Sequence, residues 1–104
     1  MLFKQEHINP ILFGNKTTTR RAWKKPMVKV GGIYKCKTKM FSKDFFVKIK
    51  VIKLYKQKLG DMYGDDYSKE GYDSYKEFRR VWEEINGSWE DNLEVYVVEF
   101  EVVR

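Results

Sequence analysis

The sequence predicts an α+β domain, in which a partly closed mixed β-barrel packs around one main amphipathic helix with short flanking helices. Three stretches alternate apolar and polar residues as strands do, one has helical spacing with a capping signal, and no regular βαβ alternation is present. With 104 residues, 16% of them aromatic, the chain has enough large apolar side chains for one core. We therefore expect a single domain over residues 1–104.

The first third of the chain carries weak structural signals. Residues 2–6 are predicted to form a short strand, and residues 7–13 a brief helical turn that Gly14 ends. Residues 16–21 are polar and rich in threonine, without helical or strand periodicity, so we expect a loop or a short extended piece. The glycine pair at 31–32 marks a turn before the next element.

Two lysine-rich strands are predicted next. Residues 33–39 alternate between apolar or small residues and lysines, which is the period of a half-exposed strand. Residues 45–56 alternate over a longer stretch, but Ile52 and Leu54 change the phase. Such a slip indicates a β-bulge or a strand end buried on both sides. Together the two strands place a ladder of lysines on one face: Lys35, Lys37, Lys39, Lys48 and Lys50.

The last third contains the clearest elements. Residues 59–70 read as an irregular connection with one short helix. Ser74 and Glu77 then form a capping box, and apolar residues repeat at helical spacing until an Asn-Gly pair, which predicts a helix over 74–85. Alternation over residues 96–102 predicts a final strand, whose core-facing residues are Tyr96, Val98, Phe100 and Val102.

Charge is divided unevenly along the chain. The net charge is +6, but residues 1–58 carry +14 and residues 59–104 carry −8. If the basic half forms one surface, it attracts polyanions such as RNA. The alternative is a solvated lysine-rich surface of the kind found in heat-stable proteins.

The composition argues against several classes of protein. The single cysteine, Cys36, has no partner for a disulfide, and with one histidine, His7, the chain lacks a set of residues at metal-ligand spacing. We therefore expect no metal and no cofactor. The N-terminus lacks the apolar core of a signal peptide, and no stretch has the length of a membrane span. These features predict a cytoplasmic monomer or weak dimer with no membrane partner.

The stretch from Gly14 to Arg21 is the most informative part of the chain. It contains Gly-x-Lys-x-x-Thr-x-Arg, with Gly14, Lys16, Thr19 and Arg21 at the four fixed positions. This pattern resembles that of the ASCH family, a branch of the PUA-like barrels. Further matching features extend the resemblance, in the same order, over nearly the whole chain: Pro10-Ile11-Leu12, Lys29-Val30-Gly31, Glu70-Gly71 with Phe78 and Trp82, and Val98-Glu99-Phe100.

The resemblance implies a cleft in which the motif residues meet RNA or a nucleoside. Some similar proteins are small amidohydrolases that remove an acyl group from N4 of cytidine, using a lysine and a threonine of the motif and a glutamate before the helix. The matching positions here are Lys16, Thr19 and Glu70. A ribonuclease activity has also been proposed within the family. The residues expected to bind the substrate or nucleic acid are Gly14, Lys16, Thr19, Arg20, Arg21 and Trp23.

The chemistry of these side chains is compatible with hydrolysis. A threonine hydroxyl becomes a nucleophile when a base takes its proton, and Lys16 can be that base if burial or a neighbouring cation lowers its pKa. Glu70 can orient the lysine or pass a proton to the leaving amine. The alternative is that Lys16 and Arg21 only bind phosphate, Thr19 satisfies the loop backbone, and Glu70 neutralises a nearby lysine.

Three functional hypotheses follow from the sequence. The first is a module that binds RNA or a modified nucleoside in a basic cleft around the motif. The second is an amidohydrolase that acts on N4-acetylcytidine. The third is a protein-interaction module that uses the basic and acidic parts of the chain. Trp23 can stack on a base in the first two, although packing at the rim of the core is the alternative.

Overall fold

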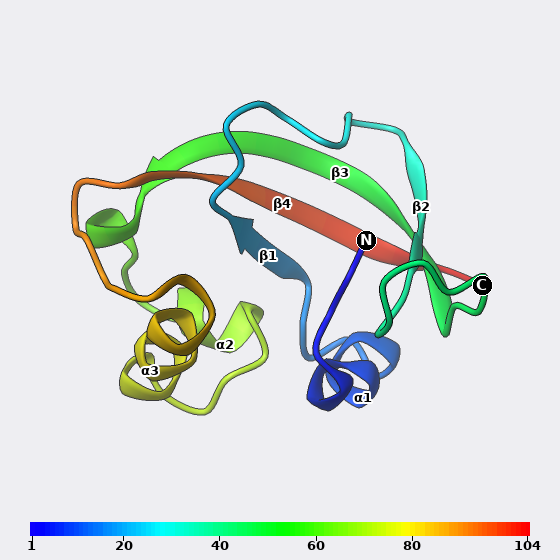
Figure 1. The fold of residues 1–104 in the computed structure, drawn as a ribbon, viewed down its shortest axis with the longest axis horizontal. Helices are drawn as coiled ribbons and strands as arrows, with labels where there is room; N and C mark the ends of the chain where they lie inside the picture. The colour runs from blue at the N-terminus through cyan, green and yellow to red at the C-terminus, as the bar shows by residue number, and fades with distance from the viewer.

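The structure is a computed structural model that describes residues 1–104. Four antiparallel strands form one sheet in the order β1-β4-β3-β2, and the long β3 and β4 arch over the molecule (Figure 1). In the same view α1 lies under the right-hand half of this arch, and α2 and α3 lie under its left-hand half. The elements in chain order are η1 (Gln5–His7), α1 (Ile8–Leu12), β1 (Thr18–Arg21), β2 (Ile33–Cys36), β3 (Val47–Lys58), η2 (Leu59–Asp61), α2 (Asp66–Lys69), α3 (Tyr75–Asn86) and β4 (Glu94–Val103).

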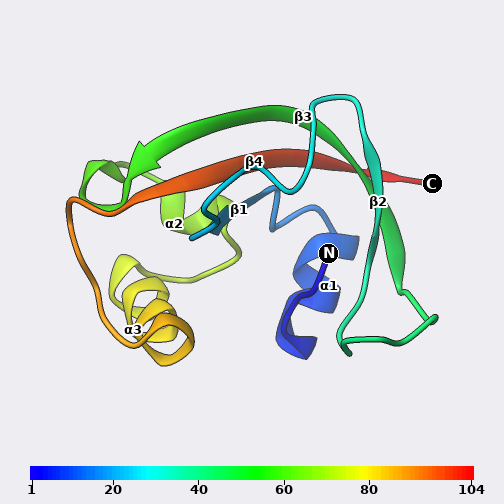
Figure 2. The ribbon, with the colours of Figure 1, turned by 45° about the horizontal axis from the view of Figure 1, so that its top comes forward.

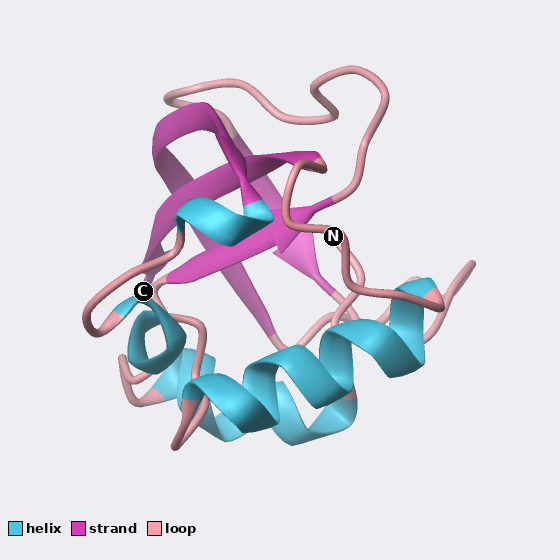
Figure 3. Ribbon diagram, turned by 90° about the vertical axis from the view of Figure 1, so that its left-hand side faces the viewer, coloured by secondary structure: helices cyan, strands magenta, loops and turns pink.

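A β-bulge bends the central pair of strands. Val51 of β3 lies opposite Phe100 of β4, and Lys53 lies opposite Glu99, so Ile52 is the extra residue between them. This confirms the predicted bulge at the change of phase. Because a bulge strengthens the local twist, it helps the sheet to curl (Figures 2 and 3).

The curled sheet is closed only in part. β1 and β2 are its two edges, and the N-terminal segment runs beside β2 through a parallel bridge between Leu2 and Lys37. The N–H of Phe3 donates to the Lys37 carbonyl at 2.8 Å, and the N–H of Lys37 donates to the Met1 carbonyl at 2.8 Å. The predicted α+β fold, a partly closed barrel with one main helix, is therefore confirmed.

The N-terminal region corrects two expectations. The strand predicted for residues 2–6 is wrong, because only Leu2 forms a bridge and the chain enters η1 at Gln5. The helical turn that follows is confirmed as α1, and Gly14 after it has a φ of 81°. Residues 16–21, left open as a loop or an extended piece, contain the edge strand β1, which pairs with β4.

The main helix begins and ends as predicted. The hydroxyl oxygen of Ser74 accepts from the N–H of Glu77 at 3.1 Å, and Gly87 has a left-handed φ of 91° just after the last helical residue. The apolar face of α3 packs against Leu59, Met62 and Val95 in one core cluster.

β4 is buried on more residues than the alternation predicts. Val98 and Phe100 are in the core as expected, but Val95 and Val97, on the opposite face of the strand, are also buried. Val95 packs against Phe78 and Trp82 of α3, so the helix covers this face of β4, while Tyr96 and Val102, which were predicted to face the core, are only half-buried. In this structure no helix has the length and apolar character needed to cross a membrane.

Candidate functional site

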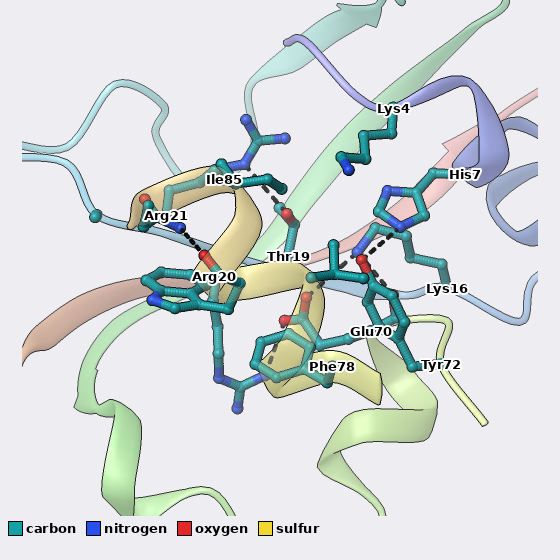
Figure 4. A pocket seen from close by; sticks show the side chains of 14 residues that line it. Lys4, His7, Lys16, Thr19, Arg20, Arg21, Glu70, Tyr72, Phe78 and Ile85 are labelled. Carbon is teal, nitrogen blue, oxygen red and sulfur yellow. Dashed lines mark hydrogen bonds and ion pairs between the residues drawn. The ribbon is translucent and has the colours of Figure 1, made fainter. Parts of the chain in front are cut away.

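A cleft with a volume of about 120 Å³ lies beside β1, which is an edge strand of the sheet. The N-terminal segment and α3 line it together with β1 and its flanking residues (Figure 4). The apolar part of its wall comes from Phe78, Val81, Trp82 and Ile85 of α3. The polar side chains that matter for its chemistry are Lys16, Thr19, Arg20, Arg21, Glu70 and Tyr72.

Lys16 is buried at the bottom of the cleft, where only 2% of its surface is exposed. Its N–H donates to the Pro10 carbonyl at 2.9 Å, which holds the residue against the end of α1. Its Nζ donates to the backbone carbonyls of Thr18 and Glu70, both at 2.9 Å, and to Glu70 Oε1 at 3.3 Å. These three acceptors match the three protons of an ammonium group, so Lys16 is held in one orientation.

Glu70 joins the motif to the segment before α3. It follows α2, and it forms an isolated bridge with Lys16. Its Oε2 accepts from Arg20 Nη1 at 2.8 Å and lies 3.3 Å from the hydroxyl of Thr18, which donates to it. One buried carboxylate therefore serves two buried cations, Lys16 and Arg20. Arg20 also lies 3.6 Å from Asp66 Oδ2, which contributes a second negative charge.

Thr19 and Arg21 alternate with Thr18 and Arg20 along β1. Arg21 Nε donates to the hydroxyl oxygen of Thr19 at 3.2 Å, and Arg21 Nη2 donates to the Leu2 carbonyl at 2.7 Å. Arg21 has no carboxylate within ion-pair distance, in contrast to Lys16 and Arg20. Arg21 is therefore the cation of this cluster whose charge has no direct partner.

Burial changes the acidity of Lys16. Desolvation lowers the pKa of its amine, Glu70 opposes the change, and the positive charge of Arg21 adds to it. A lysine in these surroundings gives up its proton more readily than an exposed one, which suits a proton acceptor.

A neutral pair forms part of the cleft wall. His7 Nε2 lies 2.9 Å from the hydroxyl of Tyr72, and the two rings meet edge to face (Figure 4). Burial, together with the nearby cations Lys16, Arg21 and Lys4, lowers the pKa of His7 to about 3. Burial also raises the pKa of Tyr72. Both rings are therefore uncharged near neutral pH.

The structure brings five of the expected residues to this cleft: Lys16, Thr19, Arg20, Arg21 and Glu70. Lys16 and Glu70 are in contact, but the hydroxyl of Thr19 is hydrogen-bonded to Arg21 and to neither of them. Trp23 lies elsewhere, with its ring 6.1 Å from that of Tyr96. Gly14 lies in the exposed turn after α1.

The fold is similar to several solved structures. An ASCH domain from Lactobacillus crispatus has a TM-score of 0.62 and 16% identity, with 91% of this chain and 69% of that chain covered. The ASCH protein from Zymomonas mobilis has a TM-score of 0.67 and 13% identity over 100% of this chain and 68% of its own. The hypothetical protein PH0355 has a TM-score of 0.72 and 22% identity over 99% and 96%. This chain has an ASCH-like fold.

Comparison by sequence adds nothing to this result, since no family model and no curated protein matches the chain. The ASCH-like fold, a PUA-like half-barrel, is consistent with what the motif implied. It also explains why Lys16 and Glu70 meet, because the turn after α1 and the turn after α2 lie side by side at the edge of β1.

Three residues of the site were not recognised in the sequence as part of it. Thr18 donates a hydrogen bond to Glu70. His7 and Tyr72 form the neutral pair, and none of these three residues belongs to a sequence motif. Thr18 shares a face of β1 with Arg20, two residues on, but the sequence showed no strand alternation there that would have indicated it. The structure has no group of three or more metal-ligating side chains.

Proposed function

We propose that the cleft binds one nucleoside, either free or as an unpaired base of RNA. The size of the cleft supports this, because about 120 Å³ accommodates a single flat group and is too little for a drug-sized ligand. Its walls also support it, since Tyr72, Phe78 and Trp82 line it and the half-buried ring of Tyr72 keeps exposed surface on which a base can stack.

The distribution of charge favours recognition of a base over recognition of phosphate, because Arg21 is the one cation of the cleft that has no carboxylate partner. Lys16 and Arg20 are buried and already share Glu70, so they are poorly available to phosphate groups. Trp82 and Arg20 line the cleft, and their Nε1 and Nε atoms are buried without a hydrogen-bond partner, so a ligand reaches these donors only when the side chains shift. Because an unpaired buried donor is unfavourable, these groups suit an acceptor such as a base carbonyl. They are the observation that carries the proposal.

Glu70 suits an exocyclic amine. Its Oε1 accepts one hydrogen bond from protein, that of Lys16, and a carboxylate oxygen has room for a second. Cytosine offers an amine beside carbonyl and ring acceptors, so it matches a carboxylate next to free donors. We therefore expect cytidine to bind better than uridine.

Isothermal titration calorimetry with cytidine and uridine tests this proposal. We expect one site per chain, with cytidine favoured. Trp82→Phe keeps most of the ring and removes the N–H, so it should weaken cytidine binding about fivefold. Trp89→Phe is the matched control, because Trp89 Nε1 donates to Asp91 outside the cleft. Absence of heat with every nucleoside, or equal affinity of the two variants, would refute the proposal.

A second candidate function is hydrolysis of N4-acetylcytidine. It is favoured by the lowered pKa of Lys16 and by Arg21, whose Nε donates to the hydroxyl oxygen of Thr19 and would stabilise an alkoxide there. In this scheme Lys16, once neutral and turned from Glu70 towards the hydroxyl of Thr19, takes the Thr19 proton as the oxygen attacks the acyl carbon. The C–N bond breaks and the amine leaves with that proton. Water then hydrolyses the threonine ester and releases the acid.

Release of cytidine from N4-acetylcytidine tests the second candidate. Thr19→Val and Lys16→Met should each lower kcat at least a hundredfold, which is about the contribution of a positioned acid–base group. Arg79→Ala, on the exposed side of α3, should leave it unchanged. Turnover by the Thr19→Val protein at the normal rate would exclude Thr19 as nucleophile, while nucleoside binding without turnover would leave the first function alone.

A further inference from the structure

A second basic surface lies at the hairpin that joins β2 to β3. Lys35 lies in β2, Lys48 lies in β3, and Phe45 and Phe41 lie in the loop between the two strands. We call these four residues the hairpin cluster. Phe45 is 42% exposed and Phe41 is 97% exposed, although both are large and apolar. Exposed aromatic side chains next to cations mark an interaction site more often than isolated apolar residues do.

Two lysines face each other in the hairpin cluster. Lys35 lies directly opposite Lys48 in the register of β2 and β3, an arrangement in which like charges repel. Neither has a carboxylate within ion-pair distance. Farther along β3 the situation differs, since Lys53 lies 3.9 Å from Glu99 of β4. Lys35 and Lys48 are therefore two uncompensated charges held side by side at the hairpin end of β3.

The ring of Phe45 lies within cation–π distance of both charges. Lys35 Nζ is 5.1 Å from the ring centroid and Lys48 Nζ is 5.7 Å from it. A partly exposed ring near two ammonium groups matches an unpaired nucleotide, because a base can stack on the exposed part of the ring while its phosphates meet the lysines. Phe41, which has a φ of 63° and no cover, offers a second ring nearby in the chain.

The hairpin and the cleft are joined by a short segment of chain. Lys37, at the base of the hairpin, forms its bridge with Leu2. Lys4, two residues after Leu2, lines the cleft. Because two residues of extended chain span roughly 7 Å, the bridge between Leu2 and Lys37 lies close along the chain to the cleft residue Lys4.

We propose that the hairpin cluster binds single-stranded RNA and guides the strand towards the cleft. Lys35 and Lys48 contact phosphates, Phe45 stacks on a base, and a neighbouring nucleotide of the same strand enters the cleft. This extends the proposed function and rests on it in one respect, the nucleic-acid nature of the ligand. Both lysine amines lie close to the ring of Phe45. This alternation of charge and aromatic surface suits RNA, with its bases and phosphates, better than it suits insertion into a lipid surface.

Fluorescence anisotropy with a labelled single-stranded RNA of about ten nucleotides tests this inference. Lys35→Ala/Lys48→Ala should lower the slope of log K against log salt concentration by about 1.4, because each phosphate contact to a single strand contributes about 0.7. Phe45→Ala should weaken binding about tenfold. Lys53→Ala/Lys56→Ala is the matched control with the same loss of charge elsewhere on β3.

The outcomes separate this inference from the function of the cleft. Hairpin variants that lose RNA but keep the calorimetric affinity for cytidine would support it. RNA binding without any nucleoside binding would support the hairpin contacts and overturn both the cleft proposal and the entry of a nucleotide into the cleft. Equal effects of the two double variants would overturn it, as would tighter binding to a duplex of the same length. Binding to phosphatidylserine vesicles in place of RNA would also overturn it and assign the surface to membranes.

Discussion

The amine of Lys16 donates to both the backbone carbonyl and the carboxylate of Glu70, a residue that lies 54 positions later in the chain. The same carboxylate accepts from Arg20, so it holds two buried cations. This contact closes the bottom of the cleft, and it ties the segment after α1 to the segment before α3. The contact between Lys16 and Glu70 therefore contributes both to stability and to the chemistry of the cleft, and different variants can separate the two contributions.

Glu70→Ala should be strongly destabilising. It leaves Lys16 and Arg20 buried with Asp66, 3.6 Å from Arg20, as the remaining carboxylate, and removal of one partner from a buried ion pair costs about 3–5 kcal/mol. Urea denaturation followed by tryptophan fluorescence gives the free energy of unfolding. Glu83→Ala breaks the exposed pair with Arg79 and is the control, expected to cost less than about 0.5 kcal/mol. Similar losses in both variants would contradict a buried, charge-sharing role for Glu70.

Gly71→Ala should damage the same contact through the backbone. Gly71 has a φ of 92°, and a Cβ there would lie 3.2 Å from the Cβ of Lys16. We expect a loss of about 2–3 kcal/mol, the sum of a backbone penalty and displacement of Lys16. Gly64→Ala separates the two effects, because Gly64 also has a positive φ but open space around it, so only about 1–2 kcal/mol should be lost. Thermal denaturation of both variants makes the comparison, and a Gly71→Ala protein no less stable than Gly64→Ala would mean that Lys16 moves freely.

The elements with local signals could be predicted from the sequence. The helix α3 has a cap at Ser74 and a left-handed glycine after it, so its limits depend on nearby residues alone. The bulge at Ile52 was visible because one added residue reverses the alternation of everything after it. Neither feature depends on distant parts of the chain.

The elements without local signals could not be predicted in the same way. β1 is a strand because it pairs with β4, and its buried polar side chains, Thr18 and Arg20, hide the alternation that would reveal it. Residues 2–6 suggested a strand, but the chain turns into η1 at Gln5 and only a bridge to Lys37 remains. In both cases tertiary contacts outweigh local pattern.

The candidate site also contains residues that the local sequence predicts and residues that only tertiary contacts bring together. The motif placed Lys16, Thr19 and Arg21 near one another because they are close in sequence, and resemblance added Glu70. The contact between the hydroxyl of Thr18 and Glu70 depends on the direction of each side chain at an edge strand, which no spacing in the sequence reveals. Likewise, His7 reaches Tyr72 across 65 positions.

His7 should make stability depend on pH. Its pKa is about 3 in the folded protein and about 6.5 in an unfolded chain, so between these values the unfolded state binds more protons. Stability is therefore complete above pH 6.5 and falls as the pH decreases through this window, with a slope that approaches one proton. Urea denaturation of the normal protein and of His7→Gln, between about pH 5 and 7, measures it where most carboxylates do not titrate. The curves of the two proteins should diverge as the pH falls, and parallel curves would contradict a desolvated neutral His7.

Cys36 should be inert in the folded protein and reactive only after unfolding. It lies in the core cluster with Phe3, Ile11 and Ile49, has no exposed surface, and burial raises the pKa of its thiol to about 11. Since the thiolate is the reactive form, labelling at about pH 8 should be at least a hundredfold slower in buffer than in urea. Ser88→Cys in a Cys36→Ala chain is the control, because Ser88 is exposed and its thiol should react at once. Rapid labelling of Cys36 without urea would mean that β2 separates from the N-terminal segment in the native state. Because the proposed path of RNA follows that segment from the hairpin to the cleft, the same result would also weaken the proposed link between the two surfaces.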